Sequence, residues 1–362
     1  NMNQLVANGD INEWKAFPYD CRKSVDDIVN TEQNIGNNKV VLLQSVFESL
    51  VASSSNGKVT IISHSNGGLI AKAFLQKLKD DKQVGRNNLI DNVDVLILVA
   101  VPEIGTAKAI PAMLHGYDSQ MLLGWLMDEV RARELGRNMP GGYGLLPSQQ
   151  YINHVSASPI TFTDSGISSN VTTAMVSRYG SSVNSYSEYK DFLFGFEGRT
   201  NPGTSQTYLP INLSQGLFRE AEDLHSVIDN FIPPGSLRVI EVAGWGLDTI
   251  ASFEYYLRIV GCSGQGAGCI SYLLDQRPHF TVDGDKTVVV PSAHYMNFQG
   301  NAERYWVNLE EHNNELFVDL RRNREHKDIF EVNQVNSFIT SVIKKEDLVF
   351  DTVLKDTMPV DT

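Results

Sequence analysis

The sequence is poor in cysteine, in long apolar runs and in positive charge. Its 362 residues include three cysteines and no run of about 18 apolar residues, so nothing in the chain is expected to span a membrane. The formal net charge of −13 makes nucleic acid and anionic membrane surfaces poor partners through bulk electrostatics. The apolar fraction of 42% is ordinary for a globular protein. A chain of this length holds two average domains, or one α/β domain with an insertion.

Two of the three cysteines bracket a glycine-rich stretch. Cys262 and Cys269 enclose residues 263–268 (Ser-Gly-Gln-Gly-Ala-Gly) and could close a small disulfide, with a pair of free thiols as the alternative. No second Cys/His pair with ligand spacing lies nearby, so a zinc site is not expected. The sequence implies no metal and no organic cofactor.

The most informative stretch covers residues 59–78. Residues 59–62 are β-branched and apolar, as in a buried strand, and from residue 68 onward apolar side chains recur on one helical face. Between them, residues 63–67 read Ser-His-Ser-Asn-Gly. A serine at a sharp strand-to-helix turn, with small residues two positions to either side, is the nucleophile elbow of hydrolases. We therefore expect Ser65 to be a nucleophile and Gly67 to be small for lack of space; a plain polar loop is the alternative.

A serine hydroxyl needs a histidine base, and the base needs a carboxylate that orients it. In hydrolases with this elbow the chain order is serine, acid, histidine. His326 is expected to be the base, because it lies between a predicted strand over residues 316–320 and a predicted closing helix over residues 332–343. His312 and His294 are the weaker candidates.

Two carboxylates in a tight turn beside an apolar run are the candidates for the acid. Asp285 is the expected acid, Asp283 is the alternative, and Asp248 is a more distant candidate. The backbone N–H of Asn66, the residue after the nucleophile, is expected to stabilise the oxyanion. A strand and an oxyanion loop normally precede the region of residues 14–19, so we expect this chain to be a piece of a longer protein that lacks its first strand.

Strand, helix and strand follow one another around the elbow, which predicts an α/β fold with a mostly parallel central sheet and helices on both faces. Further predicted elements are strands over residues 14–19, 93–101 and 237–243 and helices over residues 40–52 and 110–135.

The predicted organisation has an insertion inside the sheet domain. Residues 1–103 are the first half of the core, and residues 236–343 are the second half. Residues 104–235 are a cap or lid, because much of this region is rich in Ser, Thr, Asn and Gly. Residues 344–362 have no clear core face and are expected to be a tail or linker.

Six short segments, in chain order, are similar to motifs of one known family. They are residues 17–24, similar to a Tyr-Asp-Trp-Arg segment with Cys21 where tryptophan is usual; residues 63–67, similar to Gly-His-Ser-Met-Gly; residues 102–109, similar to Pro-x-x-Gly-Thr-Pro-Lys-Ala; residues 145–148, a Leu-Leu-Pro-Ser motif; residues 284–293, similar to Gly-Asp-Gly-Thr-Val-Pro with Lys286 in place of glycine; and residues 326–329, similar to a catalytic histidine segment. The chain thus resembles the lecithin:cholesterol acyltransferase-like family of α/β-hydrolases, with its bacterial esterase and phospholipase relatives.

The resemblance implies an α/β-hydrolase fold and, at the matching positions, Ser65, Asp285 and His326 as a catalytic triad. It implies a serine hydrolase acting on carboxylic esters, above all lipid acyl esters, or an acyltransferase that uses the same triad. Two other hypotheses are a peptidase on this fold and a protein that is not an enzyme, namely a catalytically silent binding module of a larger protein. The expected partner is a lipid or other ester, with peripheral contact to lipid surfaces, and the expected location is secreted or cell-surface.

Overall fold

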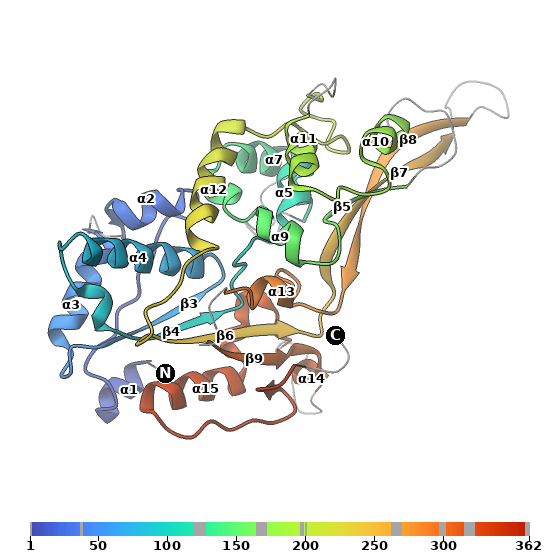
Figure 1. Cartoon of the computed structure of the whole chain (residues 1–362). Helices are drawn as coiled ribbons and strands as arrows, with labels where there is room; N and C mark the ends of the chain where they lie inside the picture. Colours follow the sequence, from blue (N-terminus) through green and yellow to red (C-terminus); the bar gives the residue numbers. More distant parts are fainter. Residues whose placement is uncertain are drawn as a thin grey trace.

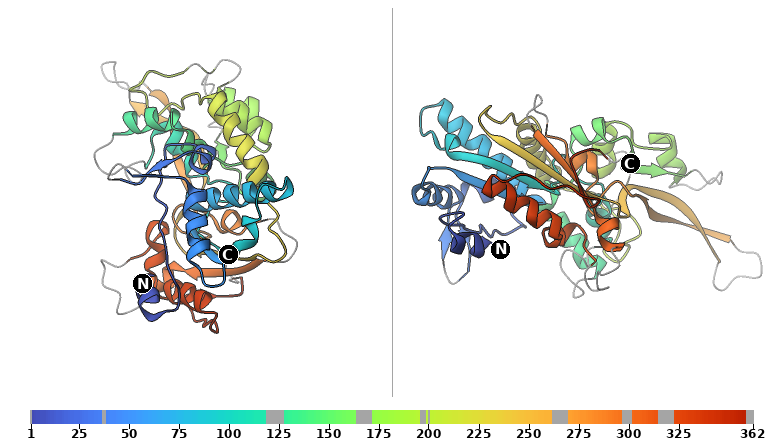
Figure 2. Two further views of the ribbon diagram at one scale, coloured as in Figure 1. Left: turned by 90° about the vertical axis from the view of Figure 1, so that its left-hand side faces the viewer. Right: turned by 90° about the horizontal axis from the view of Figure 1, so that it is seen from below.

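The computed structural model describes residues 2–36, 39–118, 128–163, 172–195, 199, 201–261, 270–296, 302–314 and 323–358. A main sheet with helices on both faces forms the lower part of the molecule in Figure 1, and a cap of short helices lies above it. A long hairpin extends from the cap away from the main sheet, as the right-hand view of Figure 2, seen from below, also shows.

Most helices either cover the main sheet or build the cap. The helices are α1 (Met2–Asn8), α2 (Val25–Asn30), α3 (Leu43–Ser53), α4 (Asn66–Gln83), α5 (Ala109–His115), α7 (Glu129–Arg137), α8 (Pro140–Tyr143), α9 (Gln149–His154), α10 (Thr172–Tyr179), α11 (Tyr186–Phe194), α12 (Gln215–Ile228), α13 (Val290–Ala293), α14 (Leu309–Asn314) and α15 (Asn333–Lys344), with 3-10 turns η1 (Leu89–Asn92) and η3 (His326–Glu331). The strands are β1 (Gln33–Asn34), β2 (Val40–Val41), β3 (Val59–His64), β4 (Val93–Val99), β5 (Ile160–Phe162), β6 (Arg238–Trp245), β7 (Thr249–Gly261), β8 (Ile270–Thr281), β9 (Ala302–Asn308) and β10 (Leu354–Lys355). No helix in the described part of the chain is long and apolar enough to cross a bilayer.

The main sheet has the strand order β10-β9-β6-β4-β3 within the described residues. β3, β4, β6 and β9 are mutually parallel, and β10 pairs antiparallel with β9 at the edge. This confirms the predicted mostly parallel central sheet. Because parallel strands end at the same side of a sheet, the segments that follow β3, β4, β6 and β9 meet there, which is where open α/β sheets place their sites.

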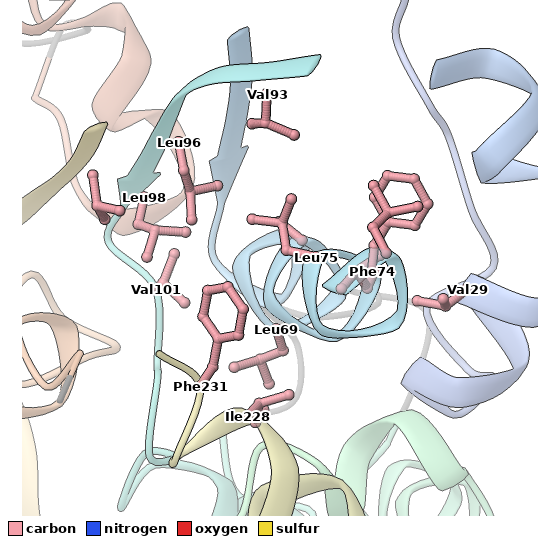
Figure 3. Close-up of a cluster of buried hydrophobic side chains, with 14 of the residues drawn as sticks. Val29, Leu69, Phe74, Leu75, Val93, Leu96, Leu98, Val101, Ile228 and Phe231 are labelled. Atoms are coloured by element: carbon pink, nitrogen blue, oxygen red, sulfur yellow. The ribbon is translucent and has the colours of Figure 1, made fainter. Parts of the chain in front are cut away.

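β4 shows how the two faces are filled. Its side chains alternate, so Leu96 and Leu98 pack toward α4, whereas Val95, Ile97 and Val99 belong to the core on the α15 side. Figure 3 shows the layer on the α4 side. Its labelled side chains come from α2, α4, β4 and α12 and from the residues just after β4 and α12: Val29, Leu69, Phe74, Leu75, Val93, Leu96, Leu98, Val101, Ile228 and Phe231. Each fully buried side chain of this kind stabilises the fold by about 1.5–3 kcal/mol relative to its exposed state.

The cap has its own apolar core around a second sheet of β5, β7 and β8. The rings of Phe162, Phe192 and Tyr255 pack at centroid distances of 5.3 to 6.0 Å. Tyr255 comes from the β7–β8 hairpin, which lies between β6 and β9 in sequence but pairs with β5 of the cap. The cap core therefore draws on residues 249–281 as well as on the predicted insertion, whose limits stay a prediction.

Two parts of the main sheet were not expected. β9 was missed because Glu303 and Arg304 interrupt its apolar pattern; in the sheet they pair with Arg238 and Glu241 of β6, at 2.7 and 2.9 Å. The predicted tail also contains β10, since Val353 and Leu354 are each 1% exposed and complete the core beside α15. A tail or linker is therefore the wrong description for these residues.

Other predicted elements have a different outcome. Residues 14–19 form no strand, because they have no neighbouring strand to pair with in the described structure. The predicted helix over residues 110–135 ends early, at the left-handed Gly116 (φ 73°), and α7 begins at residue 129. The predicted strand over residues 316–320 and the Cys262–Cys269 pair lie outside the described residues. Cys21 is an exposed free thiol.

Candidate active site

Ser65 occupies the sharp turn between β3 and α4. Its φ of 53° and ψ of −134° are rare for a residue with a side chain. The backbone N–H of Ser65 donates to the carbonyl of Val99 (3.1 Å), and the N–H of Gly68 donates to the carbonyl of Ser65 (2.9 Å). Strand and helix thus hold the strained turn from both sides and keep the hydroxyl at its apex.

The tightest position near the turn is one residue later than the sequence indicates. A Cβ added to Gly67 would lie 3.9 Å from the Cβ of Ser63, which is an ordinary contact, whereas one added to Gly68 would lie 2.3 Å from the side chain of Val101. The expectation that Gly67 is the crowded position is therefore wrong. Ser63 fits because its hydroxyl donates to the carbonyl of Ile97 (3.2 Å).

Three side chains that are far apart in sequence meet at this turn. His326, at the start of η3, has its Nε2 2.8 Å from the Oγ of Ser65 and its Nδ1 2.8 Å from Oδ2 of Asp285. A carboxylate oxygen only accepts, so Nδ1 carries the imidazole proton and Nε2 accepts from the serine hydroxyl. This arrangement can take a proton from Ser65 and stabilise the resulting imidazolium.

Asp285 is brought to the site by the hairpin that precedes it. The chain leaves the carboxyl end of β6, runs out and back through β7 and β8, and returns so that Leu247 and Gly284 bond through their backbones (3.1 Å). Asp285 is 1% exposed, and its Oδ1 accepts the backbone N–H groups of Thr287 (3.1 Å) and Val288 (2.8 Å). These donors satisfy the buried charge and leave Oδ2 facing the imidazole.

Lys286 has the backbone conformation that glycine adopts easily. Its φ is 77°, a value that glycine adopts at little cost, which explains the glycine at this position of the Gly-Asp-Gly-Thr-Val-Pro motif. The N–H of Lys286 donates to the hydroxyl of Thr249 (2.8 Å), and its ammonium lies 2.9 Å from the carboxylate of Glu325. The lysine therefore links the loop that carries the acid to the residue before the histidine.

The rival candidates lie in other surroundings. Asp248 is exposed, and Asp283 has a buried Oδ1 with no hydrogen-bond partner among the described residues. Burial raises the pKa of Asp283. His294 is buried and bonds the carbonyl of Tyr305 (3.2 Å), while His312 is buried on α14.

Asn66 is the first residue of α4. Its backbone N–H therefore has no acceptor within the helix and is available at the same helix end as the Ser65 hydroxyl. The positive end of the helix dipole lies at this point as well. The position matches the predicted oxyanion donor, and the role itself stays a prediction.

A second Ser/Asp/His cluster has a different connectivity. Asp229 is its centre: Oδ2 accepts from the hydroxyl of Ser148 (2.7 Å), and Oδ1 lies 2.8 Å from Nδ1 of His225. Nε2 of His225 donates to the carbonyl of Gly144 (3.0 Å). The serine faces the carboxylate and not the imidazole, so this cluster provides no base. It connects the Leu-Leu-Pro-Ser segment to the end of α12.

A buried charged network was missed by the sequence analysis. Lys72 of α4 lies 2.9 Å from Glu103, and both side chains are at most 1% exposed. Glu241 of β6 accepts from Arg304 and from the N–H of Met296, each at 2.9 Å. Burial, followed by the neighbouring Glu103, raises the pKa of Glu241 well above its usual range. The sequence did carry a signal for this network: Lys72 and Glu241 are single charged residues within otherwise apolar stretches of α4 and β6.

The sequence model of the lecithin:cholesterol acyltransferase family matches residues 2–333, a range that contains Ser65, Asp285 and His326. This chain belongs to that family. Membership implies the α/β-hydrolase fold and points to chemistry on lipid acyl esters in general.

A solved structure and a search of curated proteins complete the comparisons. The chain is similar to one in the crystal structure of the Tle4–Tli4 complex, with 14% identity and a TM-score of 0.42. The alignment covers 79% of this chain and 59% of that one, so the present chain spans less than two thirds of the other's length. No curated protein matches the sequence. Among the described residues, no group of three or more His, Cys, Asp or Glu side chains could hold a metal ion.

Proposed function

We propose that this protein is a serine hydrolase of carboxylic esters whose substrates are lipid acyl esters. The observation that carries the proposal is the relay from Ser65 through His326 to Asp285, with both hydrogen bonds at 2.8 Å. Family membership supports the acyl-lipid class of substrate. A buried, fully bonded acid behind the base is what a nucleophilic serine requires and what a silent binding module does not need.

In the proposed reaction, Nε2 of His326 takes the hydroxyl proton while Oγ of Ser65 bonds the ester carbonyl carbon. Asp285 stabilises the imidazolium and keeps its orientation. The tetrahedral intermediate collapses when the imidazolium gives its proton to the departing alcohol, which leaves an acyl group on Ser65. Water, deprotonated by His326, then attacks the acyl carbon. The bond from this carbon to Oγ of Ser65 breaks, the acid leaves, and His326 returns the proton to Oγ.

Oxyanion stabilisation in this scheme comes from the backbone N–H of Asn66. A donor of this kind is worth about 10²- to 10³-fold in rate. The first turn of α4 adds its dipole, since the developing charge lies at the helix N-terminus.

A transferase is the second candidate, and the family description favours it, since it names an acyltransferase. The chemistry differs only in the last step, where an acceptor alcohol replaces water. An extracytoplasmic location and contact with lipid surfaces belong to the same proposal. Two exposed apolar side chains at the end of β8, Phe280 (54%) and Val282 (49%), support the contact.

Hydrolysis of a short-chain nitrophenyl ester by wild type and by Ser65→Ala tests the proposal. The variant is expected to lose at least about 10⁴-fold in kcat, because the nucleophile is gone. Ser148→Ala is the matched control, since that serine faces a carboxylate, and it should keep the wild-type rate. Undiminished activity in Ser65→Ala would refute the assignment.

A further inference from the structure

The residue before the nucleophile makes a specific contact with the residue proposed as the base. His64 ends β3, and its Nε2 lies 2.8 Å from the backbone carbonyl of His326. A carbonyl only accepts, so Nε2 of His64 carries a proton and donates it. The His64 ring also lies against η3, with centroid distances of 4.9 Å to the His326 ring and 5.5 Å to the Phe330 ring.

This contact completes the anchoring of the His326 main chain. The N–H of His326 donates to the carbonyl of Asp285 (3.0 Å), and its C=O accepts from His64. The segment is a short 3-10 turn, η3, with a non-helical residue at Asp328, so it lacks the regular hydrogen bonds of an α-helix. Asp285 and His64, the residue before Ser65, thus hold the backbone of His326.

The charge state of His64 suits this place. Burial, followed by the neighbouring His326, lowers the pKa of His64 to about 4, while Asp285 opposes the shift. The ring is therefore neutral near pH 7. It donates its hydrogen bond without adding a second positive charge 4.9 Å from the imidazolium that forms during catalysis.

We propose that His64 is a positioning residue: its Nε2–H holds the carbonyl of His326 and so keeps the imidazole on the hydroxyl of Ser65. The inference rests on the proposed function and adds a residue to its machinery. It acts on placement only, and misplacement of a catalytic group by about 1 Å can cost about 10²-fold in rate.

Two variants with the same amide group but different side-chain lengths test whether the donor must reach the carbonyl of His326. In His64→Gln the amide nitrogen is three bonds from Cβ, as Nε2 of histidine is, so the donor still reaches the carbonyl of His326. In His64→Asn it is one bond shorter and falls short. His64→Phe removes the donor and keeps the ring, and His154→Gln, at an exposed histidine on α9, controls for loss of a histidine elsewhere.

The experiment measures kcat and KM for the nitrophenyl ester, the rate of labelling by a fluorophosphonate, and the melting temperature of each full-length variant. His64→Asn and His64→Phe are expected to lose about ten- to hundredfold in kcat and in labelling rate, with KM and melting temperature little changed. His64→Gln should keep most of both rates. The low-field proton resonance of His326 Nδ1–H should persist in the Gln variant and broaden in the Asn variant.

The outcomes separate this inference from the proposed function. If wild type is labelled at Ser65 and the Asn and Phe variants match it, the positioning role is overturned and the hydrolase stands. The role is also overturned if the Gln variant is as slow as the Asn variant. If the Phe variant does not fold, the Gln and Asn pair still decides. A wild-type chain that neither reacts with the probe nor hydrolyses the ester refutes the hydrolase and this inference together.

Discussion

The main-sheet domain and the cap bury polar side chains in different ways. In the sheet domain, the buried Asp285 faces His326 and the buried Lys72 faces Glu103. In the cap, the buried Arg133 bonds backbone carbonyls, among them those of Thr204 (2.6 Å) and Gln206 (3.1 Å). The contact of Asp285 orients His326, whereas the contacts of Arg133 hold a segment that lacks regular structure.

The cap segment over residues 201–213 shows why such side chains are needed. It contains no helix or strand, so its carbonyls have few backbone partners. Arg199 reaches the carbonyl of Ile211 (3.3 Å), and Nδ1 of His115 donates to the carbonyl of Thr207 (2.7 Å). Burial lowers the pKa of Arg199 and of Arg133. The side chains of Arg133, Arg199 and His115 thus replace a hydrogen-bond ladder in this part of the cap.

The largest expected effect compares a carboxylate of each region. Asp285→Asn should lower kcat by about 10⁴-fold with little loss of stability, because the amide disfavours the imidazole tautomer that accepts from Ser65. Asp229→Asn changes an equally buried carboxylate bonded to His225 and Ser148, and it should lower stability with kcat per folded molecule retained. Steady-state kinetics with urea unfolding measures both. Equal losses of kcat in the two variants would show that the two carboxylates do not differ in this way.

A medium effect is expected from the cap arginine. Arg133→Met removes the buried guanidinium that donates to the carbonyls of Thr204 and Gln206, and it should lower the free energy of unfolding by about 2–4 kcal/mol. Its control is Arg131→Met on the same helix, where the side chain is 74% exposed and ion-paired with Asp128. Urea unfolding curves measure the two. If the variants are equally stable, the arginine does not hold the segment.

The main-sheet domain was largely predictable, because β4, α4 and α15 carry a single, unbroken apolar pattern. Ser65, Asp285 and His326 lie within hydrogen-bonding distance of one another, and they could be proposed from the sequence because acyl transfer uses these residue types and hydrolases with this elbow carry them in this chain order. β9 was missed, since Glu303 and Arg304 find partners only across the sheet. The cap was less predictable for the same physical reason: the partners of Arg133 are carbonyls about 70 residues away, and no local pattern signals such a bond.

The effect that is smallest at neutral pH is a pH dependence of stability, which develops only as the pH falls. Burial, as the largest cause, lowers the pKa of His115 to about 3. The folded protein therefore keeps this ring neutral, whereas the unfolded chain takes up a proton below about pH 6.5. Stability is thus complete above that pH and decreases as the pH falls toward 3, by about 1.4 kcal/mol per pH unit for the group.

The variant His115→Gln isolates this contribution from other groups. Glu241 acts in the opposite direction, because its raised pKa favours the folded state as the pH falls. The difference in unfolding free energy between wild type and His115→Gln removes that background. This difference should become smaller as the pH is lowered from 6.5 to 4.5. A difference that stays constant would show that the buried ring is not held neutral.

The central claim is that Ser65 is the nucleophile of an acyl-transfer site assembled at the end of the parallel sheet. Peptide mapping by mass spectrometry after reaction with a fluorophosphonate tests it most directly. We expect one covalent adduct, on Ser65, and no adduct in Ser65→Ala. An adduct on Ser148 or on another serine, or no adduct on the wild-type protein, would show that Ser65 is not the nucleophile.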